Sequence, residues 1–147
     1  MTNGGTRGSL DETYHAALQH DLVSLSGDPR LVGVVRRPTN WFRRSVDENH
    51  RELGPPADLL DAFRERHEDL RSRGMCDEGA HNAAWEELAF EERYREHLQT
   101  TADAIAAIDD LVFRIRTGDD IVLVCFENEN KRCHRHELVS VIEAELE

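Results

Sequence analysis

The stretch DIVLVCFENENKRCHRHELVSVIEAELE, residues 120–147, decides the fold that the sequence predicts. Within it, Ile121 to Phe126 is an unbroken apolar run rich in β-branched residues, which predicts a strand buried on both faces. An amphipathic helix is predicted next, because apolar residues recur at helical spacing, at Leu138, Val139, Ile142 and Leu146. The motif Cys133-His134-Arg135 therefore stands where a buried strand has ended and a helix begins.

A helix N-terminus offers unpaired backbone N–H groups and the positive end of the helix dipole, so it stabilises an anion or a thiolate. Cys133 is therefore a candidate nucleophile, and His134 and Arg135 are placed to support its thiolate. Glu127 follows the strand directly and can serve as an acid or base near the thiol, or orient Arg135.

A second short apolar run, Leu31 to Val35, also predicts an interior strand, and it ends in Arg36-Arg37-Pro38. Strands interspersed with helices favour an α/β fold with a small, mostly parallel sheet. Ligands of such sheets bind beyond the carboxyl ends of the strands. We therefore expect Arg36 and Arg37 to lie near Cys125, Cys133 and Arg135 in one ligand site. Arg36 is expected to bind an anion there, whereas Arg37 is more readily explained by a surface ion pair.

The length of 147 residues suits one domain with a real core. Residues 1–10 are rich in Gly and Thr and predict a disordered tail, followed by a single α/β domain over residues 11–147. Residues 12–25 fit a strand or a helix equally well. Three further helices are predicted by apolar periodicity, over Ala57–Arg73, His81–Leu98 and Ala102–Thr117.

The chain is strongly acidic, with 30 acidic against 18 basic residues and a net charge of −12, and Lys131 is its single lysine. This composition suggests a halophilic protein whose carboxylates keep it dissolved in high salt. It also disfavours non-specific binding to nucleic acid. Three cysteines, an odd number, and the lack of a long apolar segment predict a cytoplasmic protein with free thiols and no membrane span.

Several motifs recur together along the chain. They are an Arg-rich strand end followed by Pro and Trp-Phe (Arg36 to Phe42), a Leu53-Gly54-Pro55 turn before Leu59-Leu60, the pattern F-x-x-R-Y (Phe90, Arg93, Tyr94), Val124-Cys125-Phe126-Glu127, and Cys133-His134-Arg135-His136. In these motifs residues 12–146 resemble the domain of unknown function 488 family, as a haloarchaeal-like member. The resemblance implies a compact α/β domain with its first strand around Thr13 to Ala17, and it implies no assigned activity.

Each candidate residue also has a structural interpretation. Cys133 can pack under the helix while Arg135 pairs with an acidic neighbour, and structural or anion-binding use is favoured over catalysis. Cys125 is expected to fill the core. A Cys125–Cys133 disulfide that acts as a redox switch is an alternative, which a reducing cytoplasm disfavours. The phosphatase-type loop places an Arg six positions after its Cys, whereas Arg135 follows by two, so that mechanism is not transferred.

Three hypotheses follow from these residues. The first is binding of phosphate or another anion, a nucleotide being one candidate, with thiol chemistry as an open addition. The second is a non-catalytic module that recognises nucleic acid or a protein through Arg36, Trp41 and Phe42, although an aromatic pair after a strand more often covers the core. The third is a metal site, but Cys125, Cys133, His134 and His136 match no standard spacing, so neither metal nor cofactor is predicted.

Overall fold

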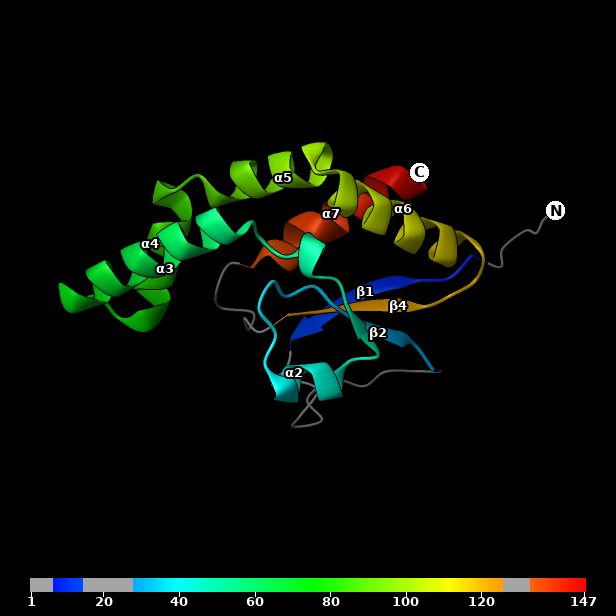
Figure 1. Cartoon of the computed structure of the whole chain (residues 1–147), viewed down its shortest axis with the longest axis horizontal. Coiled ribbons are helices and arrows are strands. Elements are labelled where there is room, and N and C mark those ends of the chain that lie inside the picture. The colour runs from blue at the N-terminus through cyan, green and yellow to red at the C-terminus, as the bar shows by residue number, and fades with distance from the viewer. Residues whose placement is uncertain (1–6, 15–27, 126–132) are drawn as a thin grey trace.

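The computed structural model describes residues 7–14, 28–125 and 133–147. A four-stranded sheet in the order β1-β4-β2-β3 forms the centre of the molecule, and every neighbouring pair is parallel. Its strands are β1 (Leu10–Tyr14), β2 (Arg30–Gly33), β3 (Glu48–Asn49) and β4 (Ile121–Cys125) (Figure 1). The predicted α/β class and parallel sheet are confirmed.

The central position of β4 explains its apolar sequence. It pairs with β1 on one side and β2 on the other, and all five of its residues are buried. A strand hydrogen-bonded on both edges and covered on both faces has no place for a polar side chain. The predicted strand is therefore confirmed as far as Cys125, while Phe126 and Glu127 lie outside the described residues.

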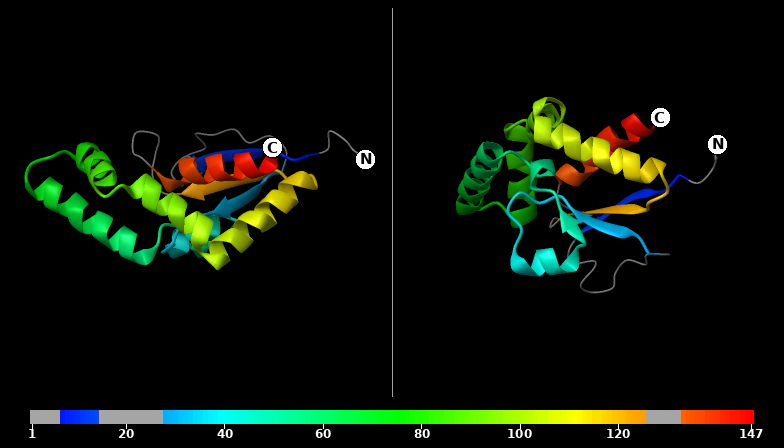
Figure 2. Two further views of the ribbon diagram at one scale, coloured as in Figure 1. Left: turned by 90° about the horizontal axis from the view of Figure 1, so that it is seen from above. Right: turned by 45° about the vertical axis from the view of Figure 1, so that its right-hand side comes forward.

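The helices are α2 (Asn40–Ser45), α3 (Ala57–Ser72), α4 (Asp77–Glu87), α5 (Phe90–Thr100), α6 (Ala102–Arg116) and α7 (His134–Leu146), with a short 3-10 turn η1 (Arg51–Leu53). Helices α6 and α7 lie on one side of the sheet and α2 on the other (Figures 1 and 2). The pair α3 and α4 extends beyond the carboxyl ends of the strands (Figure 2). This extension makes a wall where a parallel sheet presents its ligand site.

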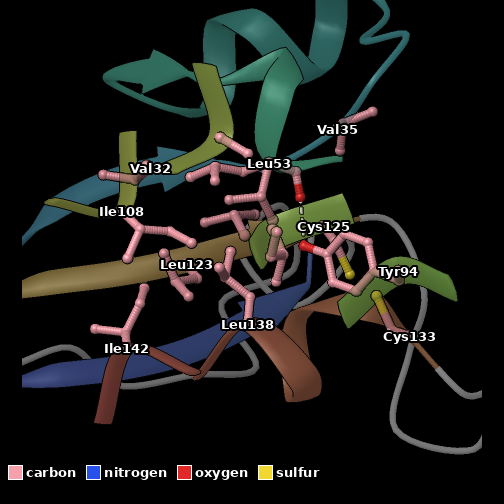
Figure 3. Close-up of a cluster of buried hydrophobic side chains, with 14 of the residues drawn as sticks. Val32, Val35, Leu53, Tyr94, Ile108, Leu123, Cys125, Cys133, Leu138 and Ile142 are labelled. Atoms are coloured by element: carbon pink, nitrogen blue, oxygen red, sulfur yellow. Dashed lines mark hydrogen bonds between the residues drawn. The ribbon is translucent and has the colours of Figure 1, made fainter. Parts of the chain in front are cut away.

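The core joins β4 to α6 and α7. Leu111 and Ile115 of α6 are fully buried in it. So are Leu123 from β4 and Leu138 and Ile142 from α7, which Figure 3 shows. In α7 the apolar residues at helical spacing, Leu138, Ile142 and Leu146, are buried and Val139 packs against the core, so the predicted apolar face of this helix is confirmed. In α6 the apolar residues that were expected to point inward are buried except for Ile105, which is 38% exposed. Burial of such side chains stabilises the fold by roughly 1.5–3 kcal/mol each before entropy is counted.

The prediction of one helix over His81–Leu98 is wrong, because two helices occupy this region. Helix α4 begins earlier, at Asp77, where the Cys76 sulfur accepts a hydrogen bond from the Gly79 N–H at 3.3 Å. The chain then turns at Ala89, which has a left-handed φ of 50°. The break brings Phe90 back onto Trp85, with stacked rings 4.0 Å apart, and this contact is invisible to a periodicity argument.

The N-terminal strand begins at Leu10, three residues before the Thr13–Ala17 strand implied by the resemblance. Residues 1–6 and 15–27 lie outside the described residues, so the tail and the strand-or-helix question there stay predictions. Among the described residues, no helix has the length and apolar character needed to cross a membrane.

Candidate functional site

A cavity of about 240 Å³ is lined by residues at or just after the carboxyl ends of β2 and β4 and by residues of α3 and α4. Five of the residues singled out in the sequence line it: Arg36, Arg37, Cys125, Cys133 and His134. They come from three separate segments, so the parallel arrangement of β2 and β4 is what brings them together. This is the edge of the sheet at which the sequence predicted a site.

Cys133 is the residue that precedes α7, and its backbone is extended, with φ −140° and ψ 143°. Its side chain does not cap the helix, and its sulfur lies 3.7 Å from Nδ1 of His134. The other ring nitrogen of His134, Nε2, lies 2.6 Å from the carbonyl oxygen of Val34. Since a carbonyl can only accept, Nε2 carries a proton, and in the neutral ring Nδ1 is an acceptor that faces the Cys133 thiol.

A second thiol stands next to the first. The sulfur atoms of Cys125 and Cys133 point toward one another (Figure 3), and the two side chains hydrogen-bond. Burial, followed by this hydrogen bond, raises the pKa of Cys125 well above its ordinary value, so Cys125 remains a protonated thiol. A protonated Cys125 is a donor to the sulfur of Cys133.

Arg135 does not line the cavity but lies behind it, with 2% of its surface exposed. Its Nη1 donates to the Cys125 sulfur at 2.7 Å, and its Nε donates to the Glu12 carboxylate of β1 at 3.0 Å. Its guanidinium carbon also lies 5.7 Å from the centre of the Tyr14 ring. The acidic neighbour anticipated for Arg135 thus comes from the first strand, 123 residues away in sequence.

The Leu53-Gly54-Pro55 turn holds Arg36 at the cavity. Nε of Arg36 donates to the carbonyl oxygen of Pro55 at 2.8 Å, and a Cβ on Gly54 would lie 2.5 Å from the Arg36 backbone nitrogen. Only glycine permits this approach. Burial, followed by repulsion from Arg51, lowers the pKa of Arg36. Among the described residues Arg36 has no ion pair, so its charge is desolvated without a carboxylate partner.

The same turn anchors Tyr94, which is fully buried. Its hydroxyl donates to the carbonyl oxygen of Leu53 at 2.5 Å (Figure 3), and burial raises its pKa well above the ordinary value. The Tyr94 ring meets the His134 ring edge to face, with centroids 5.3 Å apart. Tyr94 therefore remains a donor, and it supports the face of His134.

The other two arginines of the cavity differ from each other. Arg37 donates to the Asp61 carboxylate at 2.8 Å, the surface ion pair expected from the sequence. Arg64, from α3, lines the cavity and has no ion pair among the described residues. Arg36 and Arg64 are thus the two cavity arginines that form no ion pair within the described part of the chain, and they meet Glu52 and Asp61 only through longer-range electrostatic attraction.

The remaining wall consists of rings that sequence reasoning did not assign to the site: Phe63, His67, His81, Trp85 and Phe90. His81 packs edge to face on Phe63 at 4.9 Å and lies roughly parallel to Trp85 at 6.2 Å. One signal was available in the sequence. Leu60, Phe63, Arg64 and His67 follow i, i+3, i+4, i+7 spacing and so share one face of α3, which mixes apolar with basic side chains.

Two predicted site residues, Trp41 and Arg135, do not line the cavity. Trp41, on α2, is 70% exposed, whereas its neighbour Phe42 is fully buried. Glu127 lies outside the described residues. His136, in the first turn of α7, does not line the cavity, and its Nδ1 lies 2.6 Å from the Glu12 carboxylate. In the described part of the chain, no three His, Cys, Asp or Glu side chains are grouped as metal ligands would be.

A larger hollow of about 490 Å³ lies between α5, α6 and α7, with Leu98, Ile105 and Val141 among its lining residues. Its charged residues are Arg95, Asp109 and Glu145, and it contains neither a thiol nor an imidazole. The cavity of about 240 Å³ is therefore the better candidate for a functional site, because thiol, imidazole and guanidinium groups converge there.

Comparison with known proteins gives one match. Residues 18–146 match a family model named DUF488-N3a and described as the active DUF488-N3 subclade. No curated protein and no solved structure matches significantly. The matched span runs through every cavity-lining residue, from Val35 to His134, and leaves out β1 with Glu12. With the match covering most of its length, the chain belongs to the domain of unknown function 488 family.

Proposed function

We propose that this protein binds a small phosphorylated ligand with a flat ring, of the nucleotide class, in the cavity at the strand ends, and that Cys133 acts on it as a nucleophile. The observation that carries the proposal is the convergence on one cavity of two arginines that form no ion pair among the described residues, a wall of rings and a thiol–imidazole pair. The family description as an active subclade agrees with a working site.

The cations supply the anion-binding half of the proposal. Arg36 is partly desolvated and its side chain is held by the Pro55 carbonyl, so a phosphate entering the cavity meets a positioned charge. Arg64 approaches from α3, so two cations reach the cavity from different elements. An anion here supplies the carboxylate-like partner that neither arginine has among the described residues.

The rings supply the second half. Phe63, Trp85 and Phe90 give the cavity an aromatic wall, and aromatic faces stack on nucleobases of any kind. A cavity of about 240 Å³ suits a small molecule and does not enclose a polymer. A mononucleotide combines the two features that the lining favours, a phosphate and a planar ring.

The chemistry proposed for the site is proton transfer from Cys133 to Nδ1 of His134, which leaves a thiolate that faces the cavity beside a protonated imidazole. The hydrogen bond from Nε2 to Val34 keeps Nδ1 turned to the sulfur, so His134 is set as the base. The N-terminus of α7 and the Cys125 thiol both stabilise a negative sulfur at this position.

The binding half is tested by titration calorimetry with AMP and with inorganic phosphate. We expect Arg36→Gln to weaken AMP binding by about tenfold or more, because one positioned charge contact is lost. The matched control is Arg44→Gln on α2, an exposed arginine outside the cavity, which is expected to bind AMP normally. No AMP binding by the wild type, or equal binding by both variants, contradicts the proposal.

The thiol half is tested by the rate of iodoacetamide labelling, resolved by residue with mass spectrometry. We expect Cys133 to react faster than Cys125, His134→Gln to slow it, and AMP to protect it. Cys76 is exposed and does not line the cavity, and it serves as the internal reference. If His134→Gln leaves the Cys133 rate unchanged, the assignment of His134 as the base is wrong.

One observation favours a second candidate function, recognition of single-stranded nucleic acid through α2. Trp41 is 70% exposed, and its neighbours Arg43 and Arg44 are exposed without ion pairs among the described residues. An exposed Trp beside arginines can stack on a base and contact phosphates. In this case Trp41→Ala and Arg44→Gln weaken binding of a fluorescent oligonucleotide, while Arg36→Gln does not, which is the reverse of the pattern expected for AMP.

A further inference from the structure

Two buried thiols share the wall of the cavity, and their sulfur atoms point toward one another (Figure 3). We propose that Cys133 and Cys125 are a redox pair, in which a hydroperoxide oxidises Cys133 and Cys125 then closes a disulfide with it. This inference concerns regulation of the same site and rests on the proposed activation of Cys133 by His134. It does not depend on which ligand the cavity binds.

The surroundings of the two sulfurs differ, and the difference assigns their roles. Cys133 faces a proton acceptor, Nδ1 of His134, and lines the cavity at the start of a helix. Cys125 ends the central strand, where burial holds it as a thiol, and it receives a hydrogen bond from Arg135. The thiolate is the form that reacts with peroxide, so Cys133 is the attacking residue and Cys125 the resolving one.

In the first step the Cys133 thiolate attacks one oxygen of the hydroperoxide. An S–O bond forms, the O–O bond breaks, and the leaving alkoxide takes the proton held by His134, which yields an alcohol and a sulfenic acid. In the second step the Cys125 sulfur attacks the sulfenic sulfur, so the S–S bond forms and the S–O bond breaks. The departing hydroxide takes the Cys125 proton as water, and the two thiols have supplied the two electrons.

The closeness of the Cys125 thiol to Cys133 favours the second step over further oxidation of Cys133. The sulfenic acid forms beside a thiol that already hydrogen-bonds to it, and neither residue has to leave the cavity wall. Disulfide formation removes the Cys133 nucleophile from the cavity. It also converts the Cys125 thiol, which accepts a hydrogen bond from Arg135, into a disulfide sulfur. Oxidation therefore switches off the thiol chemistry, and reduction by a dithiol restores it.

The test uses the full chain treated with hydrogen peroxide, after which free thiols are alkylated under denaturing conditions and peptides are mapped by mass spectrometry. We expect a Cys125–Cys133 disulfide in the wild type, with Cys76 still free. In Cys125→Ser, sulfenic acid at Cys133, trapped with dimedone, should rise about tenfold because the resolving thiol is missing. Cys76→Ser is the control and should form the same disulfide as the wild type.

The wild-type map alone decides the matter if Cys125→Ser fails to fold. Absence of the Cys125–Cys133 link while Cys76 or Cys133 is overoxidised overturns the inference, as does equal oxidation of Cys125 in Cys133→Ser. AMP titration of the reduced protein separates this result from the proposed function. If AMP binds but no disulfide forms, the redox pair is refuted and the proposed ligand site stands. If the disulfide forms but AMP does not bind, the redox pair stands and the proposed ligand site is refuted.

Discussion

Arg114 and Arg36 show two opposite uses of arginine in one small fold. Arg114, on α6, holds the Glu48 carboxylate with two hydrogen bonds of 2.8 and 3.1 Å, and also contacts Asp110. Hydrogen bonding to Glu48 raises the pKa of Arg114, whereas burial and a neighbouring Arg51 lower that of Arg36. The folded state thus favours the charge of Arg114 and disfavours the charge of Arg36.

The difference separates arginines that stabilise the fold from an arginine that we propose binds a ligand. Glu48 contacts Arg30, His50 and Arg114, and we call this group the Glu48 cluster. The cluster joins β3 to α6, and the charge of each arginine in it is paired with the Glu48 carboxylate. Arg36 donates to two backbone carbonyls and faces a cavity. A partly buried guanidinium that forms no ion pair lowers the stability of the folded protein, and binding of an anion beside it would raise that stability.

The largest effect is expected from Arg135, which is more deeply buried than either. Arg135→Met removes its hydrogen bonds to Glu12 and Cys125, and we expect the free energy of unfolding to fall by about 3 kcal/mol. Urea denaturation followed by circular dichroism measures the loss. A change below about 1 kcal/mol would mean that the buried guanidinium is not needed to join β1 to α7.

The second prediction compares the same substitution, Arg to Gln, at Arg114 and at Arg36. Arg114→Gln should lower the free energy of unfolding by about 1–2 kcal/mol and leave AMP binding unchanged, because its partners are carboxylates of the fold. Arg36→Gln should leave stability unchanged or slightly raised while weakening AMP binding. Parallel denaturation and calorimetry of both variants make the check, and equal loss of stability in both contradicts the comparison.

The third prediction uses the pH dependence of the Glu48 cluster. Hydrogen bonding from Arg114, partly offset by burial, lowers the pKa of Glu48 from 4.5 to about 2. Its stabilising contribution is therefore present above pH 4.5 and is lost as the pH falls from 4.5 toward 2. We expect Glu48→Gln to cost about 1–2 kcal/mol at pH 7 and almost nothing near pH 2.

The comparison of wild type and Glu48→Gln across this pH range, in low and high salt, isolates the cluster from the other carboxylates. Salt should shrink the gap, since the cluster is only partly buried. A gap that stays constant from pH 7 to pH 2 would show that the loss comes from packing and not from charge.

The smallest effect is expected from Arg37, the cavity arginine that has a carboxylate partner. Arg37→Gln breaks an exposed ion pair with Asp61, so the melting temperature should not change measurably. AMP binding should fall less than in Arg36→Gln, because the Arg37 charge is already balanced by Asp61 in the free protein. Equal losses of AMP affinity in the two variants would remove the distinction between paired and unpaired cations.

Several features could be predicted because local sequence determines them. A continuous run of apolar residues predicted β4, and helical spacing predicted α3, α6 and α7 to within a few residues. Parallel strands end at one edge, so the meeting of Arg36 with Cys125 and Cys133 also followed. The helix break at Ala89 could not be predicted, since the periodic apolar residues continue across it. Its structural reason is the stacking of Phe90 on Trp85, which is a tertiary contact.

By itself the sequence determined the class of fold, the central strand, and the edge where thiols and arginines gather, because these depend on hydrophobic spacing and on the direction of parallel strands. Tertiary structure decided which charge each residue meets. Arg135 turned to Glu12 and away from the cavity, Arg36 to a carbonyl, and His134 toward the sulfur of Cys133. Such partners lie far apart in the chain, and burial and geometry, which no local pattern encodes, select them.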